Sequence, residues 1–220
     1  MTHSIKVQFA LWVPHDWCGF AEVTCDGEFS WLPIEHAAAY NDLLIEDWLG
    51  RERLTCCDFQ GGFLIDFDGK RWNENAIDEF QFTMTWLMAL EKLLNGETEA
   101  HVSPYEQGTL LLLRDEDNLT MFEPEVNVRS RRADFCPPIT VSFAAFTQQV
   151  AAQSKLFAAW VRSLNAAVER RHPPVNATYI PAAYTPEEKL VKITQEIPLH
   201  YAEQVEAFAS RVEWDSAPQR

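Results

Sequence analysis

Residues 83–96 read TMTWLMALEKLLNG. Their apolar side chains recur at intervals of three and four residues from Trp86 to Leu94, so they fall on one face of a helix. Asn95-Gly96 is a typical helix end, because both residues tolerate the left-handed backbone conformation. The stretch therefore predicts a short helix that buries one side.

Strands are predicted on both sides of this helix. Before it, Ile5 to Pro14 alternates between apolar and polar residues, and Asp26-Gly27 supplies the positive φ angles of a tight hairpin. After it, Gln107-Gly108 and the polar stretch 115–118 separate three short apolar or alternating runs. The predicted strands are 5–14, 17–25, 28–32, 54–59, 63–67, 100–105, 109–113 and 119–128.

Helices complete the pattern. Residues 33–48 have a helical apolar face, and the longest helix is predicted from Ser142 to about Arg171, lying across the sheet. We therefore expect an α+β fold, an antiparallel sheet of six to eight strands packed by two or more helices. Residues 1–171 form the expected main domain, and residues 172–220 a Pro-rich connection and a helical extension that packs on it.

Negative charge is concentrated in one part of the chain. The formal charge is −15, and residues 1–128 hold 24 of the 33 carboxylates but seven of the 18 lysines and arginines. Acidity of this kind serves solubility, or it serves a basic partner. Nucleic acid is disfavoured as a ligand because its phosphates would meet like charge. The asymmetry favours a basic protein partner.

Cysteine usage and hydropathy indicate a cytoplasmic protein. The five cysteines, which include the adjacent pair Cys56-Cys57, are odd in number and argue against a disulfide scaffold, so we expect reduced thiols. The N-terminal residues lack the features of an export signal, and no apolar run approaches the ~18 residues of a membrane span. We expect no membrane association.

The motifs do not disclose a catalytic chemistry. His15-Asp16-Trp17-Cys18 lacks the second ligand pair of a zinc site, and residues 115–118 lack the alternating ligands of a calcium loop. No serine lies in a G-x-S-x-G elbow, and Gly61-Gly62 lies between predicted strands, where a phosphate-binding loop is not expected. We predict no catalytic residue, no metal and no cofactor, and a binding protein in place of an enzyme.

The order of elements from Phe80 to Pro124, with the apolar helix Thr83–Gly96 followed by paired strands and then a long helix, resembles small acidic bacterial proteins of the immunity type. The resemblance covers about half of the chain. It implies a cytosolic antidote that binds a basic toxin, commonly a nuclease, and masks its active or substrate-binding face.

Acidic residues at turns and helix ends are the expected partner-binding residues. They would occupy the positions of nucleic-acid phosphates on a basic toxin and would steer its association. Exposed aromatic residues would anchor the centre of the interface. The acidic candidates are Glu46, Asp47, Asp115, Glu116, Asp117, Glu123 and Glu125. The aromatic candidates are Trp12, Trp17, Trp31 and Trp72.

Two alternatives stay open. Asp66 and Asp68 are two residues apart in a predicted strand, so their carboxylates would point the same way and would suit a carboxylate-dependent hydrolase. The other alternative is a subunit of a stable oligomer, with aromatic residues buried between chains. A cleft holding two converging carboxylates would favour the hydrolase, and a flat acidic face would favour the binding protein. The sequence predicts no particular oligomeric state.

Overall fold

The computed structural model describes residues 4–26, 29–50, 60–72, 78–79, 81–102, 109–123, 138–171 and 199–216. The strands are β1 (Ile5–Trp12), β2 (Thr24–Asp26), β3 (Phe29–Pro33), β4 (Gln60–Phe67), β5 (Lys70–Arg71), β6 (Asp78–Glu79), β7 (Glu99–Val102), β8 (Leu110–Asp115), β9 (Asn118–Phe122) and β10 (Ile139–Ser142). The helices are η1 (His15–Gly19), α1 (Ile34–Ala37), η2 (Ala38–Tyr40), α2 (Asn41–Gly50), α3 (Gln81–Leu94), α4 (Phe143–Arg171) and α6 (Leu199–Ser216), of which η1 and η2 are 3-10 helices.

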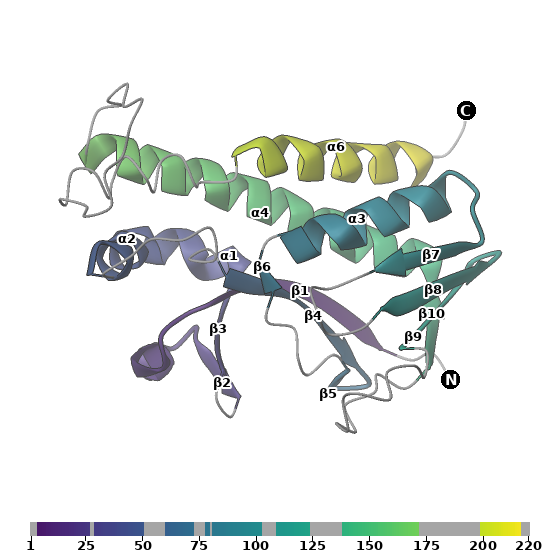
Figure 1. The fold of residues 1–220 in the computed structure, drawn as a ribbon, viewed down its shortest axis with the longest axis horizontal. Coiled ribbons are helices and arrows are strands. Elements are labelled where there is room, and N and C mark those ends of the chain that lie inside the picture. The colour runs from purple at the N-terminus through teal and green to yellow at the C-terminus, as the bar shows by residue number, and fades with distance from the viewer. Residues whose placement is uncertain are drawn as a thin grey trace.

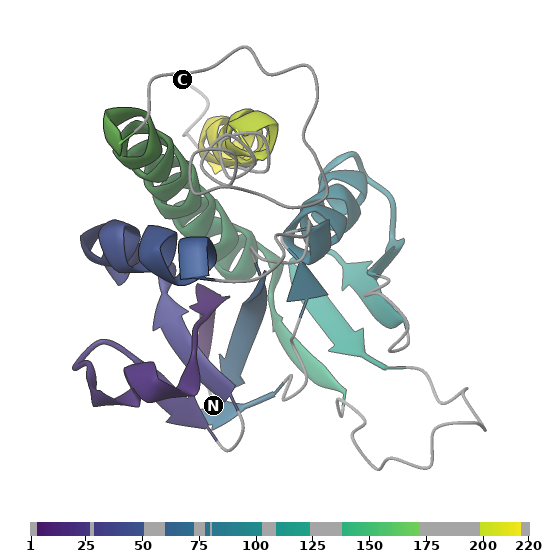
Figure 2. The ribbon, with the colours of Figure 1, turned by 60° about the vertical axis from the view of Figure 1, so that its left-hand side comes forward.

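The predicted α+β class is confirmed, and the antiparallel strands are divided between two sheets. The first sheet has the order β2-β3-β1-β4-β5, with β6 also paired to β4, and the second has the order β10-β9-β8-β7. The two sheets lie side by side, and the long helix α4 runs across both (Figures 1 and 2).

Side chains of α4 cap one edge of β1. β3 pairs with β1 only from Ala10 to Trp12. Between residues 5 and 9, the backbone of β1 is hydrogen-bonded to side chains of α4. Gln149 accepts a hydrogen bond from Val7 N–H and donates one to the Ile5 carbonyl, both at 2.9 Å. Gln153, one helical turn later, accepts a bond from Phe9 N–H at 2.9 Å. Side chains of a helix therefore bind the backbone edge of β1 beyond its pairing with β3.

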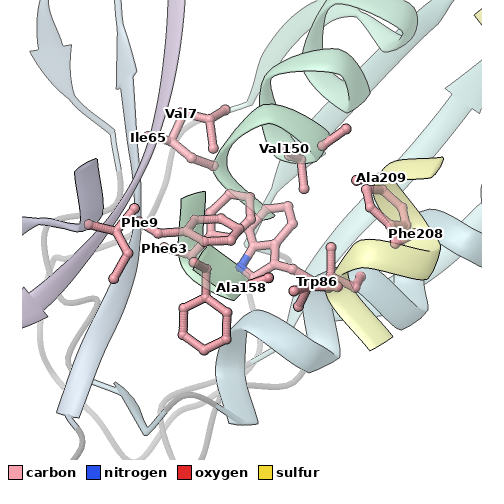
Figure 3. Close-up of a cluster of buried hydrophobic side chains, with 14 of the residues drawn as sticks. Val7, Phe9, Phe63, Ile65, Trp86, Val150, Ala158, Phe208 and Ala209 are labelled. Atoms are coloured by element: carbon pink, nitrogen blue, oxygen red, sulfur yellow. The ribbon is translucent and has the colours of Figure 1, made fainter. Parts of the chain in front are cut away.

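One hydrophobic core joins both sheets to the helices. Phe9 and Phe63 of the first sheet meet Trp86 of α3, whose ring stacks on Phe63 with centroids 4.5 Å apart. Figure 3 shows these rings together with Val150 of α4 and Phe208 of α6. Burial of each such large side chain contributes about 1.5–3 kcal/mol. The apolar face predicted around Trp86 therefore lies at the centre of the molecule.

The C-terminal helix α6 packs along α4. Val205, Phe208 and Val212 of α6 are buried in the common core. Ion pairs join the exposed sides of the two helices, one between Arg162 and Glu206, where the hydrogen bond from Arg162 lowers the pKa of Glu206. Residues 172–198, which contain the Pro-rich connection and the first part of the expected helical extension, lie outside the described residues. No helix in the described ranges combines the length and apolarity needed to cross a membrane.

The structure corrects the predicted strand 17–25. The first part of this segment is η1, in which Trp17 N–H donates to the Pro14 carbonyl at 3.0 Å. Trp17 packs against Phe20 and Tyr40, with ring centroids 5.7 and 5.9 Å away, and these two rings also contact each other, with centroids 5.4 Å apart. As a result β3, and not the segment that directly follows β1, lies beside β1.

A disulfide joins Cys18 of η1 to Cys25 of β2, with Cα atoms 5.9 Å apart. The expectation that all cysteines are reduced is wrong for this pair. The count of five cysteines could not reveal it, because the pairing depends on the turn that brings η1 back to β2. Cys56, Cys57 and Cys136 lie outside the described residues.

Candidate functional site

Five exposed carboxylates lie at one end of the second sheet. β7 begins at this end and β8 terminates there, since Glu99 at the start of β7 is paired with Leu113 near the end of β8. Arg114 N–H donates to the Thr98 carbonyl at 2.9 Å, which continues the pairing one residue beyond β7. The β8–β9 turn follows directly. We call this group the acidic end; its members are Glu97, Glu99, Asp115, Glu116 and Asp117.

The β8–β9 turn is a tight hairpin that projects its acidic residues. Asp115 is paired with Asn118, so two residues form the loop, and Glu116 adopts a left-handed conformation with φ 52°. A two-residue hairpin loop of this kind requires positive φ and follows the twist of the strands. Asp115 and Glu116 are both exposed. The hairpin therefore fixes two carboxylates in solvent on a rigid support.

Arg114 holds the turn against the helices. Its Nη1 donates to the Leu93 carbonyl at 2.6 Å and its Nε to the Glu116 carbonyl at 3.0 Å. Its guanidinium lies over the ring of Phe143, 4.1 Å from the centroid. Two N–H groups of the Arg114 guanidinium are thus hydrogen-bonded to backbone carbonyl oxygens. With Lys92, whose carbonyl accepts from Glu97 N–H, Arg114 offsets part of the negative charge of the acidic end.

Asp117 has a structural role that the sequence did not reveal. Its Oδ1 accepts a hydrogen bond from Ala144 N–H at 3.3 Å, and its Oδ2 accepts one from the Ser142 hydroxyl at 3.1 Å. Its backbone carbonyl accepts a bond from Phe143 N–H at 2.6 Å. Asp117 thus caps the first turn of α4, where a negative charge also interacts favourably with the helix dipole.

The remaining acidic candidates lie elsewhere. Glu46 belongs to α2 and accepts a hydrogen bond from Arg171 at 2.5 Å, beside the Asp42–Arg171 pair at 3.1 Å. Asp47 is half-buried on the same helix. Glu123 is half-buried beyond the far end of β9, away from the acidic end. Glu125 lies outside the described residues.

The prediction from turns therefore located three members of the acidic end, residues 115–117, and missed Glu97 and Glu99. A signal for the missed pair was present in the sequence. If the predicted strands 100–105 and 109–113 pair as a hairpin, residues just before the first strand must lie beside those just after the second.

The expectation of exposed aromatic anchors is wrong for three of the four tryptophans. Trp17, Trp31 and Trp72 are 8%, 4% and 7% exposed. Trp12 is 40% exposed, on the strand face opposite the core. The most exposed large apolar side chain among the described residues is Trp214 near the end of α6, at 82%. The alternation of residues along a strand predicts that it has two faces. It does not predict which tryptophans are covered by neighbouring segments of the chain.

Asp66 and Asp68 have separate partners. Asp66 Oδ1 accepts a hydrogen bond from Arg71 Nε at 2.7 Å across the β4–β5 pairing. Asp68 lies in the following turn with φ 49°, and its Oδ1 accepts a bond from Ser4 N–H at 2.9 Å. The two residues do not share a strand face as predicted. Within the described ranges, no group of three or more His, Cys, Asp or Glu side chains is placed to hold a metal ion.

The fold and site define an α+β protein whose second sheet ends in a group of exposed carboxylates. Comparisons of the chain with models of known protein families, with curated proteins and with solved structures gave no match.

Proposed function

We propose that this is a non-catalytic binding protein of the immunity type, which neutralises a basic toxin such as a nuclease by covering its active or substrate-binding face. The observation that supports the proposal is the acidic end, where exposed carboxylates from β7 and the β8–β9 hairpin lie together. A rigid hairpin keeps the loss of conformational entropy on binding small.

Charge complementarity gives the proposal its physical basis. A basic nuclease cleft attracts phosphates, and carboxylates fixed at the tip of a hairpin would compete for the same lysines and arginines. The attraction would accelerate association and would weaken as salt screens it, with a Debye length of about 8 Å at physiological ionic strength. The same negative charge would keep nucleic acid away from this surface.

A bacterial cytoplasmic location belongs to the proposal as well. The Cys18–Cys25 disulfide counts against it, because disulfides are rare in that compartment. Trapping thiols with an alkylating reagent during cell lysis, followed by mass measurement, would test the location. Free Cys18 and Cys25 in freshly lysed cells are expected for a cytoplasmic protein.

Charge reversal at the hairpin tests the proposed interface. The wild-type chain should capture a basic protein from its own cells in a salt-sensitive complex. The double variant Asp115→Lys/Glu116→Lys should bind that partner at least ~10-fold more weakly in a titration, which corresponds to about 1.4 kcal/mol. Asp117 stays unchanged, because its reversal would also remove the cap of α4.

The matched control is Asp16→Lys/Glu35→Lys, an equal change of charge at two exposed residues of η1 and α1. It should bind within about twofold of wild type at physiological salt, since exposed charges beyond a Debye length are largely screened. Equal weakening in both double variants would mean that net charge, and not the acidic end, governs binding.

A further inference from the structure

The second sheet has an outer face, turned away from α3 and α4, that carries apolar side chains. In β8, Leu110 and Leu112 are buried in the core, whereas Leu111 and Leu113 are half-buried. Because successive side chains of a strand point to opposite faces, the second pair lies on the outer face. β9 repeats the pattern, with Phe122 half-buried on the outer side.

The strand register brings these outer side chains together. Leu111 lies directly opposite Phe122, and Leu113 lies opposite Thr120 in the neighbouring strand. Directly opposed side chains in an antiparallel pair have Cβ atoms about 4.5–5.5 Å apart. Leu111, Leu113 and Phe122 therefore form one continuous group, which we call the outer apolar patch.

The outer apolar patch adjoins the acidic end. Glu99 is paired with Leu113, and Asp115 follows Leu113 on the same face of β8. On the other side, Thr120 and Thr140 share a hydrogen bond of 2.9 Å between their hydroxyl oxygens. None of the outer-facing residues in the described strands β7 to β10 is a lysine or an arginine. His101, opposite Leu111 on this face, has its Nε2 3.0 Å from Oε1 of Glu99. The face thus combines apolar side chains with the carboxylates of Glu99 and Asp115, of which Glu99 has a histidine partner.

We propose that the outer apolar patch is the centre of the partner interface, and that it receives apolar side chains lying between lysines or arginines of a basic protein. This inference rests on the proposed function and extends it from the hairpin tip to the sheet face. The cations of the partner would meet Glu99 and Asp115, while its apolar side chains pack on Leu111, Leu113 and Phe122. An apolar centre with a charged rim is typical of protein interfaces.

Charge selects this occupant over others. A second copy of the chain would bring Glu99 and Asp115 against like charges, and a membrane with anionic lipids would repel the same carboxylates. A basic protein surface satisfies both the apolar patch and its acidic rim.

Two synthetic peptides of equal length and charge test the inference as probes. One alternates lysine with leucine, and the other alternates lysine with serine. The full chain should bind the leucine peptide at least ~10-fold more tightly than the serine peptide at physiological salt. The variant Leu113→Thr/Phe122→Thr should lose this preference while keeping its affinity for the serine peptide. Threonine is suited to strands, so the sheet should persist.

Trp12→Thr is the matched control, because Trp12 is an exposed apolar residue on a strand of the other sheet. It should retain the preference for the leucine peptide. A second measurement uses the wild-type chain: the methyl NMR signals of Leu111 and Leu113 should shift with the leucine peptide and remain in place with the serine peptide.

The outcomes separate the inference from the proposed function. Equal binding of both peptides, or an unchanged preference in Leu113→Thr/Phe122→Thr, would overturn the outer apolar patch alone, provided Glu99→Gln/Asp115→Asn weakens both peptides. Binding that is insensitive to Glu99→Gln/Asp115→Asn would overturn the acidic end as well. Self-association of the wild-type chain that Leu113→Thr/Phe122→Thr abolishes would assign the patch to a second copy and overturn the inference.

Discussion

At the scale of single residues, Asp117 shows that an exposed carboxylate at a turn can belong to the fold. It lies between Glu116 and Asn118 in a stretch whose composition suggests only solvent or a partner. Its side chain instead accepts hydrogen bonds from Ser142 and Ala144, which lie 25 and 27 residues further along the chain. Sequence spacing cannot reveal a cap whose helix begins so far away.

Removing this cap should destabilise the protein. Asp117→Ala should lower the free energy of unfolding by about 1–2 kcal/mol, the usual effect of losing an N-cap, whereas Asp117→Asn should cost less because the amide oxygen still accepts a hydrogen bond. Urea denaturation measures both. Asp115→Ala is the control and should change stability by about 0.5 kcal/mol or less. Similar effects of Asp115→Ala and Asp117→Ala would contradict the capping role.

The hydrogen bond from the Tyr40 hydroxyl to Glu22 should make stability depend on pH. This bond lowers the pKa of Glu22 from its ordinary 4.5 and raises the pKa of Tyr40 from its ordinary 10.0. The contribution of Glu22 is therefore present above pH 4.5 and lost as the pH falls through its folded value. The contribution of Tyr40 is present below pH 10.0 and lost as the pH rises through its folded value.

Tyr40→Phe should consequently be less stable than wild type at neutral pH. The difference should shrink in acid and in strong base, and it should be small because the hydrogen bond between the two groups lies at the surface. Thermal unfolding across the pH range measures it. A difference that is constant with pH would show that Tyr40 acts through packing on Trp17 and Phe20 alone.

At the scale of elements, the sequence predicted the helices and strands that a local pattern of apolar residues and turn residues defines. The helix around Trp86, the strands β7 to β9 and the long helix α4 follow from periodicity and turn residues, and each is confirmed. β10 was not among the predicted strands; its four residues directly follow Cys136-Pro137-Pro138, and proline is disfavoured in strands. The acidic end was predicted only in part. The β8–β9 hairpin is a local feature that its turn residues indicate, whereas the pairing of β8 with β7, which brings Glu97 and Glu99 to the same end, is not local.

The edge cap of β1 is the element-scale feature that no periodicity could predict. Glutamines on a helix suggest a solvated face, but Gln149 and Gln153 bind the backbone of β1. Gln149→Ala/Gln153→Ala should lower the free energy of unfolding by about 1–3 kcal/mol for each backbone group left unsatisfied. Chemical denaturation measures the loss, and Gln148→Ala, at an exposed neighbour, should be near neutral. Equal stability of the two variants would exclude an edge-capping role.

At the scale of the whole molecule, part of the negative charge concentrated in the first part of the sequence is neutralised by ion pairs within the fold. Cations of α4 pair with acids of neighbouring helices, as Arg171 does with Asp42 and Glu46, and Arg162 with Glu206. These acids are thereby less available to a partner, and the candidacy of Glu46 is weakened. At the acidic end the described contacts of Arg114 go to carbonyl oxygens, so the excess of negative charge there remains.

The hairpin that caps α4 has an evolutionary consequence. At its tip, the side chains of Asp115 and Glu116 lie in solvent, whereas the side chain of the neighbouring Asp117 caps the helix. If the chain binds a toxin as proposed, selection for a new toxin would change the first two side chains more readily than the third, which has to remain a hydrogen-bond acceptor. Residues that set the choice of partner would then change faster in evolution than the adjacent residue that maintains the fold.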